Sequence, residues 1–511
     1  MLINDEVIEK IKDGAYLLCK AVQTTLGPNG ANVILHNESG IPYATKDGVS
    51  VAKKVFSEDP YVNAVINIIR ETAMKTAELA GDATTTTTIL ASHLIKNGIE
   101  DRASRSYILG MHLAMQDIVQ ELKSRSTSID CNSSKLQEVA TISANNDIEI
   151  GDIVARAFRI AGDNGTVLFE ESPTSQTYLE ESAGTIIDRG YADSAFVTNN
   201  KNLTAEYTNP TFLLVDDRLD KFNKIERILN ICAKNNHDLV IFAHDYSSEV
   251  IRMLALNHYK GIIRVVPITI EGIGSGKGEF IQDIAALVGA SKTDEGFYFG
   301  GQCDHIVVSG LKTVITVSQD NNTRFEKRLE RIKALIDSAT DESTKNFYCQ
   351  KLAKLAGKLC TIKVGGFTPA GRKERYDRVE DAVCATKAAL EEGVVPGGGI
   401  TLYRIAHTLF LNEKKVPSND KRMLAGYNAV LASLNWPLAI LAENAGISSE
   451  DAARLLKACE ENEGIDFISH SIVDMMQTGI IDSTKAMRVA VEHSVAVASL
   501  LLNTKCIIPY Q

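Results

Sequence analysis

The run Gly81-Asp82-Ala83-Thr84-Thr85-Thr86-Thr87-Thr88-Ile89-Leu90 carries the strongest local signal in this sequence. We expect a helix to begin here, with the threonine hydroxyls beside the unpaired N–H groups of its first turn. Such a turn can hold anionic oxygens, and Asp82 would supply a hard carboxylate for the Mg²⁺ that accompanies a nucleotide. The alternative is that Asp82 only caps the helix and the threonines form a polar surface.

Periodic apolar residues lie on the N-terminal side of this run. In residues 5–25 and again in residues 62–80 they recur every three or four positions, which is the spacing of one helix face. Between these two helices, residues 32–35 and 43–46 are typical of short strands around a turn. The N-terminal region is therefore predicted to be mainly helical.

Three further stretches place glycine where backbone could approach a ligand: residues 25–30, residues 46–50, and residues 394–400 with their three consecutive glycines. Each of the first two could equally be an ordinary turn. The glycine-rich residues 272–278 lack the spacing of a P-loop, because Glu271 stands where that motif needs glycine. We reject a P-loop there.

The middle of the chain has a different pattern. Strand-like runs at residues 211–215, 239–242 and 262–267 alternate with helical segments, which predicts a separate α/β domain. Residues 324–355 are highly charged with apolar positions at helical spacing, and they predict a solvated helical hairpin. Helical patterns return from residue 425, so we predict a domain assembled from both termini.

Net charge, cysteine spacing and the lengths of apolar runs exclude several classes of protein. The 511 residues carry a net charge of −11, which argues against a nucleic-acid binder or a binder of acidic membranes that relies on a positive field. The nine cysteines are scattered and never spaced C-x-x-C, so neither a zinc site nor a disulfide framework is indicated. The start of the chain is acidic and no apolar run approaches the ~20 residues of a membrane span. We expect a cytoplasmic protein.

Taken together, the motifs resemble one family, the group I chaperonins, which are GroEL-like ring chaperones. They occur in the family's order and cover nearly the whole chain. The matching residues are 25–28, 45–52, the threonine run, 141–145, 188–191, 378–382, 391–395 with 397–399, and 479–482.

The resemblance implies a multidomain α and α/β fold. An equatorial ATP-binding domain, mainly helical, would comprise residues 1–128 and 393–511. A small hinged intermediate domain would comprise residues 129–183 and 359–392, and an α/β apical domain that binds substrate would comprise residues 184–358.

The resemblance also implies the nucleotide site, with ATP, Mg²⁺ and K⁺ as cofactors. Asp82 would hold Mg²⁺, the backbone of Thr25 and of Lys46 would hold K⁺, and Asp482 would contact the ribose. Further contacts to the nucleotide are implied for Leu26, Gly27, Pro28, Ala83, Thr84, Thr85, Thr86, Gly398, Asp466 and Ile480.

Two carboxylates would be catalytic. Asp47 and Asp381 would orient the attacking water, with Asp381 as its general base. Because Asp381 belongs to the intermediate domain, hinge closure would gate ATP hydrolysis.

The implied partners are further copies of this chain in a homo-oligomeric ring of seven subunits, unfolded client proteins and a lid co-chaperonin. Clients would bind apolar side chains of the apical domain, because burial of apolar surface needs no particular sequence. The implied residues are Tyr191, Phe196, Ile225, Leu229, Ile251, Ala255 and Leu256. Helical spacing alone would instead place Leu229 and Ile251 in the core.

Some positions depart from the family's pattern. In the nucleotide site Ala83 replaces glycine, Asp466 replaces an asparagine that contacts the base, and Ser483 replaces proline. In the apical domain Ala195 replaces tyrosine and Glu226 replaces leucine. Such departures fit a divergent member, either paralogous or virus-encoded.

Two alternative functions are open, and the first is motivated by Ala83, Asp466 and Glu226 together with Lys358, which replaces a hinge glycine. One is a specialised holdase or assembly scaffold with weak ATP cycling. The other is a subunit of a mixed ring with a more typical paralogue.

Overall fold

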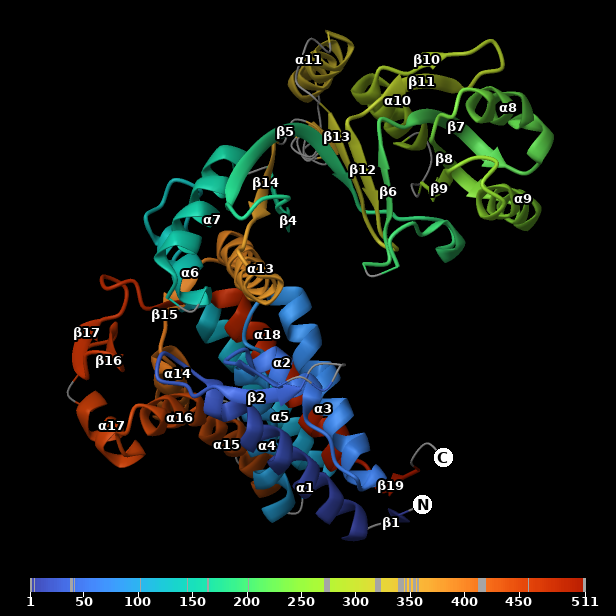
Figure 1. Ribbon diagram of the computed structural model, residues 1–511. Coiled ribbons are helices and arrows are strands. Elements are labelled where there is room, and N and C mark those ends of the chain that lie inside the picture. The colour runs from blue at the N-terminus through green and yellow to red at the C-terminus, as the bar shows by residue number, and fades with distance from the viewer. Residues whose placement is uncertain are drawn as a thin grey trace. The chain divides into compact units, whose positions relative to one another are not determined.

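Figure 1 shows the computed structural model of the chain, which folds into two compact units. Unit 1 comprises Met1–Arg156 and Val364–Gln511, and unit 2 comprises Ala157–Lys363. The structure describes residues 2–508 apart from residues 4, 37–39, 41, 102, 145, 163–164, 201, 271–275, 318–322, 339–343, 345–346, 349–350, 353–354, 356–357, 412–419 and 458. Of residues 272–278, where a P-loop was rejected, residues 272–275 lie outside the described residues. So does Asn145 of the chaperonin-like motif 141–145.

Unit 1 is mainly helical, as predicted. Its helices are α1 (Asp5–Val22), η1 (Gln23–Thr25), α2 (Gly48–Lys54), α3 (Pro60–Ala80), α4 (Thr84–Glu100), α5 (Arg105–Arg125), α6 (Lys135–Ser143), α7 (Ile148–Ala161, which continues into unit 2), α13 (Pro369–Glu392), α14 (Ile400–Leu411), α15 (Lys421–Ser433), α16 (Trp436–Asn444), α17 (Ser449–Leu456) and α18 (Thr484–Leu502). The apolar faces predicted from spacing are the buried ones: Val7, Ile11 and Leu18 of α1 face inward.

The two ends of the chain meet in unit 1. Helix α18 packs against α3 and α4, and β1 (Leu2–Ile3) pairs antiparallel with β19 (Cys506–Ile507). Figure 1 shows both termini beside this small sheet. A single apolar cluster includes side chains from both ends of the chain. The prediction of a domain assembled from both termini is confirmed.

Short antiparallel strand pairs complete unit 1. They are β2 (Val33–His36) with β3 (Pro42–Thr45), β15 (Val394–Pro396) with β18 (Ile481–Ser483), and β16 (Glu463–Asp466) with β17 (Ser471–Asp474). The β2–β3 pair agrees with the predicted strands to within one residue.

Unit 2 contains two sheets. The five-stranded sheet has the order β10 (Ser291–Lys292), β11 (Tyr298–Gln302), β7 (Thr211–Leu219), β8 (Leu239–Tyr246), β9 (Val265–Thr269). The six-stranded sheet has the order β4 (Thr166–Glu171), β14 (Lys358–Val364), β5 (Tyr178–Ile187), β13 (Thr313–Val317), β12 (His305–Val308), β6 (Ala205–Thr208). The helices of unit 2 are α8 (Glu226–Lys234), α9 (Ser248–Tyr259), α10 (Gly276–Val288) and α11 (Thr323–Ser338), with η2 (Ser194–Phe196) and η3 (Phe222–Lys224).

The predicted α/β rhythm is confirmed, because β7, β8 and β9 are parallel neighbours with helical crossovers. One boundary is corrected. The predicted strand at 262–267 begins only at Val265, since Ile262 lies in an exposed turn. The first half of the predicted hairpin is α11; its second half lies largely outside the described residues. Rather than being wholly solvated, α11 buries Ile332 and pairs Arg328 with the buried Asp283 of α10.

Among the described residues, one stretch, 421–444, is long and apolar enough to cross a membrane by length and composition, contrary to the expectation that no such run exists. It consists of two helices, α15 and α16, that meet at Leu434, and 56% of its apolar window is buried inside the protein. Its apolar character therefore serves the core of unit 1.

Candidate functional site

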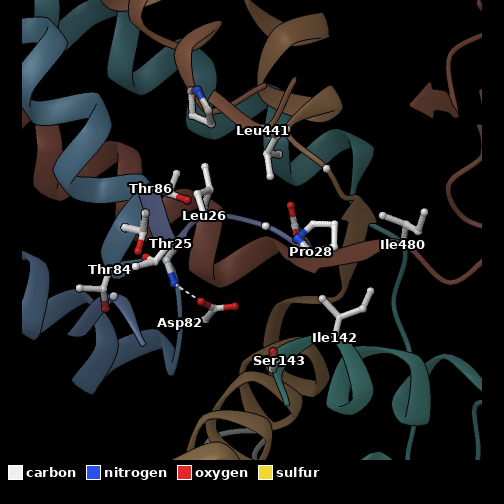
Figure 2. A pocket seen from close by; sticks show the side chains of 18 of the residues that line it. Thr25, Leu26, Pro28, Asp82, Thr84, Thr86, Ile142, Ser143, Leu441 and Ile480 are labelled. Carbon is white, nitrogen blue, oxygen red and sulfur yellow. Dashed lines mark hydrogen bonds between the residues drawn. The ribbon is translucent and has the colours of Figure 1, made fainter. Parts of the chain in front are cut away.

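A cavity of about 330 Å³ lies in unit 1, which is large enough for a small ligand. Its lining comes from segments far apart in the sequence: the loop after α1, the start of α2, the α3–α4 turn, α6, α13, the 397–399 glycines and the β16–β18 region. Figure 2 shows Thr84, Thr86 and Asp82 on one side of the cavity and Ile142 and Ile480 on the other. One side is thus polar and the other partly apolar.

The threonine run begins α4, and the structure excludes the capping alternative. The N-cap residue is Ala83, and no side chain caps this helix end. The threonines do not form a polar surface, because Thr84 and Thr86 are buried beside the cavity and Thr88 is buried within the helix packing. The α4 N-terminus therefore presents its first turn to the cavity, where the helix dipole favours an anion.

Ala83 adopts a conformation that L-residues rarely take. Its φ of 69° lies in the left-handed region, which costs alanine about 1–2 kcal/mol. The family's glycine would adopt it without this cost. The N–H of Ala83 donates to a carboxylate oxygen of Asp82 at 2.5 Å.

Three carboxylates from distant segments, Asp47, Asp82 and Asp381, meet in the cavity. Asp82 is open to the cavity and so accessible to ions. The surrounding protein raises the pKa of Asp82, and repulsion from Asp47 raises it further, whereas the hydrogen bond from Ala83 N–H lowers it. The net effect is a raised pKa. Burial, followed by repulsion from Asp47 and Asp82, raises the pKa of Asp381 well above its ordinary value. Without a cation the three groups repel one another.

Asp47 has a structural role as well. It is the N-cap of α2, and its carboxylate accepts hydrogen bonds from Val49 N–H at 3.0 Å and from Ser50 N–H at 2.8 Å. These bonds fix the carboxylate at the cavity edge while leaving lone pairs for another donor.

The 397–399 glycines allow close approach of backbone, as predicted. A Cβ on Gly397 would lie 3.0 Å from the carbonyl oxygen of Ile480, and one on Gly399 would lie 2.9 Å from the backbone nitrogen of Leu438. Strand β18, which follows Ile480, carries Asp482 into the same cavity. Enclosure, with repulsion from Asp82, raises the pKa of Asp482 to about 7.

Asp466 ends β16 at another part of the cavity lining. Its carboxylate accepts hydrogen bonds from Ser469 Oγ at 2.6 Å and from Ile468 N–H at 2.9 Å. Burial acts to raise the pKa of Asp466, but these hydrogen bonds outweigh it and hold the pKa below its ordinary value. The group is therefore an ionised acceptor already fixed by its own turn.

The loop after α1 forms a further wall. Thr25 is buried and its hydroxyl donates to Val22 O at 2.8 Å, while Lys46 Nζ donates to Pro28 O at 2.8 Å. Gly27 takes a left-handed φ of 79°, and a Cβ there would lie 2.2 Å from Leu441 Cδ2. Glycine is thus required where this loop packs on α16.

Every residue that the sequence assigned to the nucleotide site or to catalysis lines this one cavity. Sequence reasoning missed several others: Ile142, Ser143, Leu441, Phe467 and Ile468. Ile142 and Ser143 lie within a motif that resembles the family's, so that motif was the available signal. Nothing in the sequence singled out Leu441.

The residues assigned to client binding are not brought together as an exposed surface. Phe196, Ile225 and Leu229 are buried in the core of unit 2, so the expectation that they are exposed is wrong. In and before α8, Ile225, Ile228, Leu229 and Cys232 face inward at helical spacing, which leaves mainly polar side chains outside. Tyr191, Ile251 and Ala255 are half-buried against the same core, and Leu256 alone of the seven is exposed, at 46%.

Comparisons with known proteins agree with this geometry. Residues 18–511 match the TCP-1/cpn60 chaperonin family. The chain is 36% identical to chaperonin GroEL of Holospora obtusa over 521 residues, covering 99% of this chain and 94% of that protein.

Among solved structures, the fold resembles the chaperonin gp146 of bacteriophage EL of Pseudomonas aeruginosa, crystallised in the presence of ATP-BeFx. The two crystal forms give TM-scores of 0.77 and 0.70 at 22% identity, covering 99% and 100% of this chain and 98% and 99% of that one. The chain therefore belongs to the TCP-1/cpn60 chaperonin family, in its GroEL-like group I, and is an ATP-dependent chaperonin that assists protein folding.

Proposed function

We propose that the cavity of unit 1 binds ATP and Mg²⁺ and hydrolyses ATP, with Asp381 as general base and Asp47 orienting the attacking water. The observation that carries this proposal is the meeting of Asp47, Asp82 and Asp381 beside the α4 N-terminus. A triphosphate would receive N–H groups and hydroxyls from Thr84, Thr85 and Thr86. Gly398 and Ile480 would contact the adenosine, and Asp482 the ribose.

The donor set fits Mg²⁺ shared with phosphate oxygens. Among the described residues, no group of three or more His, Cys, Asp or Glu side chains is arranged to hold a metal by itself. Mg²⁺ characteristically binds through one or two carboxylates plus substrate phosphates, and Asp82 is the carboxylate open to the cavity. When bound, the ion would neutralise charge on the phosphates and relieve the carboxylate repulsion. K⁺ would be held by the backbone of Thr25 and of Lys46.

Asp381 suits a general base by its environment. A base works best when its pKa is near the operating pH, and burial with neighbouring carboxylates moves the pKa of Asp381 in that direction. Asp381 lies on α13, within the proposed intermediate domain of residues 129–183 and 359–392, so movement of this segment would control its approach to the phosphate. The equatorial and apical domains would be residues 1–128 with 393–511, and residues 184–358.

At the level of assembly we propose a cytoplasmic homo-oligomeric ring of seven subunits with a lid co-chaperonin. Its clients would bind exposed apolar side chains of α9 and the turn that follows. These are Met253, Leu256, Tyr259 and Ile262, exposed by 38%, 46%, 90% and 54%. Such surface binds unfolded chains without sequence preference.

The test is ATP turnover by the purified assembly with Mg²⁺ and K⁺. Asp381→Ala should lower kcat about 100-fold or more, as expected for loss of a general base. The matched control Asp13→Ala, on the exposed face of α1, should leave kcat unchanged. Equal turnover by Asp381→Ala and wild type would contradict the proposal. ATP-indifferent suppression of client aggregation would favour the holdase alternative.

A further inference from the structure

Helix α6 contacts both α13 and the 476–480 turn, whose Ile480 lines the cavity. It packs against α13, which carries Asp381. Its Val139 shares an apolar cluster with Ala385 of α13, one turn beyond Asp381, and with Ile481 of β18. Ile142 and Ser143, at its C-terminal end, line the cavity itself (Figure 2). Helix α6 is therefore in contact with both α13 and the strand that follows the turn.

Two polar side chains of α6 contact the 476–480 turn directly. Lys135 Nζ donates to Met476 O at 2.8 Å, a hydrogen bond between residues 341 apart in the sequence. One turn further along the helix, Glu138 packs on Gly479, where an added Cβ would lie 2.9 Å from Glu138 Cγ. Gly479 takes a φ of 78°, so the glycine is required both by conformation and by space.

The two contacts have opposite energetic signs. The Lys135 bond is a satisfied, charge-assisted hydrogen bond to a backbone carbonyl and stabilises the packed arrangement. By contrast, Glu138 Oε2 is buried and has no hydrogen-bond partner. A buried unpaired acceptor destabilises the arrangement that buries it. The contact between α6 and the turn is thus held by one residue and opposed by its neighbour.

We propose that Lys135 and Glu138 are positioning residues that couple the ligand-lining 476–480 turn to Asp381, with Lys135 favouring the packed arrangement of α6 and Glu138 favouring its release. The inference rests on the proposed ATPase site and assigns it a conformational control. A nucleotide whose base and ribose contact Ile480 and Asp482 fixes the turn, and through α6 this holds α13 against the cavity. A triphosphate without a base leaves the turn unfixed.

The experiment compares substitutions one turn apart in the full assembly. Lys135→Met should raise KM for ATP about tenfold, while the inhibition constant of inorganic triphosphate, which has no base, stays the same. Lys135→Arg, which keeps a donor, should restore KM to within twofold of wild type. Glu138→Met should lower KM for ATP a few-fold. Lys12→Met and Glu9→Met, on the exposed face of α1, are the matched controls.

Hydrogen exchange of residues 474–481 without nucleotide provides a readout that does not require turnover. It should be faster in Lys135→Met and slower in Glu138→Met than in wild type. Shifts in the same direction for both variants, or no shift in either, would overturn the coupling. Absence of ATP turnover in wild type would instead refute the proposed ATPase. The exchange data would then test only whether Lys135 stabilises, and Glu138 destabilises, the contact between α6 and the 476–480 turn.

Discussion

The nucleotide site in unit 1 and the client surface in unit 2 were both assigned from the same resemblance, but only the first set of residues lies together as assigned. In the cavity, every assigned residue lines one space. In unit 2, three of the assigned apolar residues are core and one is exposed. Enclosing a carboxylate is costly unless it has a partner, so several enclosed carboxylates indicate a binding site. An apolar side chain is equally typical of a core and of a client surface, so its residue type does not show which of the two it belongs to.

The sharpest test of this contrast exchanges core and surface within unit 2. Phe196→Ala should destabilise the protein by about 3–5 kcal/mol, because it removes a fully buried aromatic ring that contacts His258 edge-on. Leu256→Ser should leave stability within about 0.5 kcal/mol and reduce binding of an unfolded client. Thermal unfolding and a client-aggregation assay measure the two effects. If Phe196→Ala lost client binding without losing stability, the assignment of Phe196 to the core would be contradicted.

This asymmetry explains what the sequence could and could not predict. The residues of the cavity were assigned through the chaperonin-like motifs, because the threonine run alone left helix capping open as an alternative. The helical ends and the parallel strands followed from apolar spacing. Leu441 could not be found, since an apolar cavity wall has the same pattern as core. Lys135 and Glu138 could not be found either, because their contacts join segments over 300 residues apart.

The carboxylate cluster predicts a pH dependence of stability. The pKa of Asp482 is raised to about 7, above its value in the unfolded chain, so the unfolded chain releases this proton first as pH rises. The nucleotide-free protein should lose on the order of 2 kcal/mol between about pH 4 and pH 7, an effect reduced by solvent in the cavity. Asp482→Asn should flatten this slope in denaturant titrations. An unchanged slope would show that Asp482 is not the responsible group.

The smallest expected effect is at Ala83, where this chain departs from the family's glycine. Ala83→Gly relieves the left-handed strain but loses a buried methyl group and increases the freedom of the unfolded chain. These contributions nearly cancel, so stability should change by less than about 1 kcal/mol and ATP turnover by less than twofold. A gain above about 2 kcal/mol in chemical denaturation would mean that strain dominates this turn.

We propose that both ends of the chain and α13 together enclose a magnesium triphosphate. An electron-microscopy map of the assembled particles with Mg²⁺ and a non-hydrolysable ATP analogue tests it most directly. We expect phosphate density at Thr84–Thr86, cation density at Asp82, and Asp381 facing the terminal phosphate. Nucleotide bound elsewhere, or an empty cavity at saturating analogue, would contradict it.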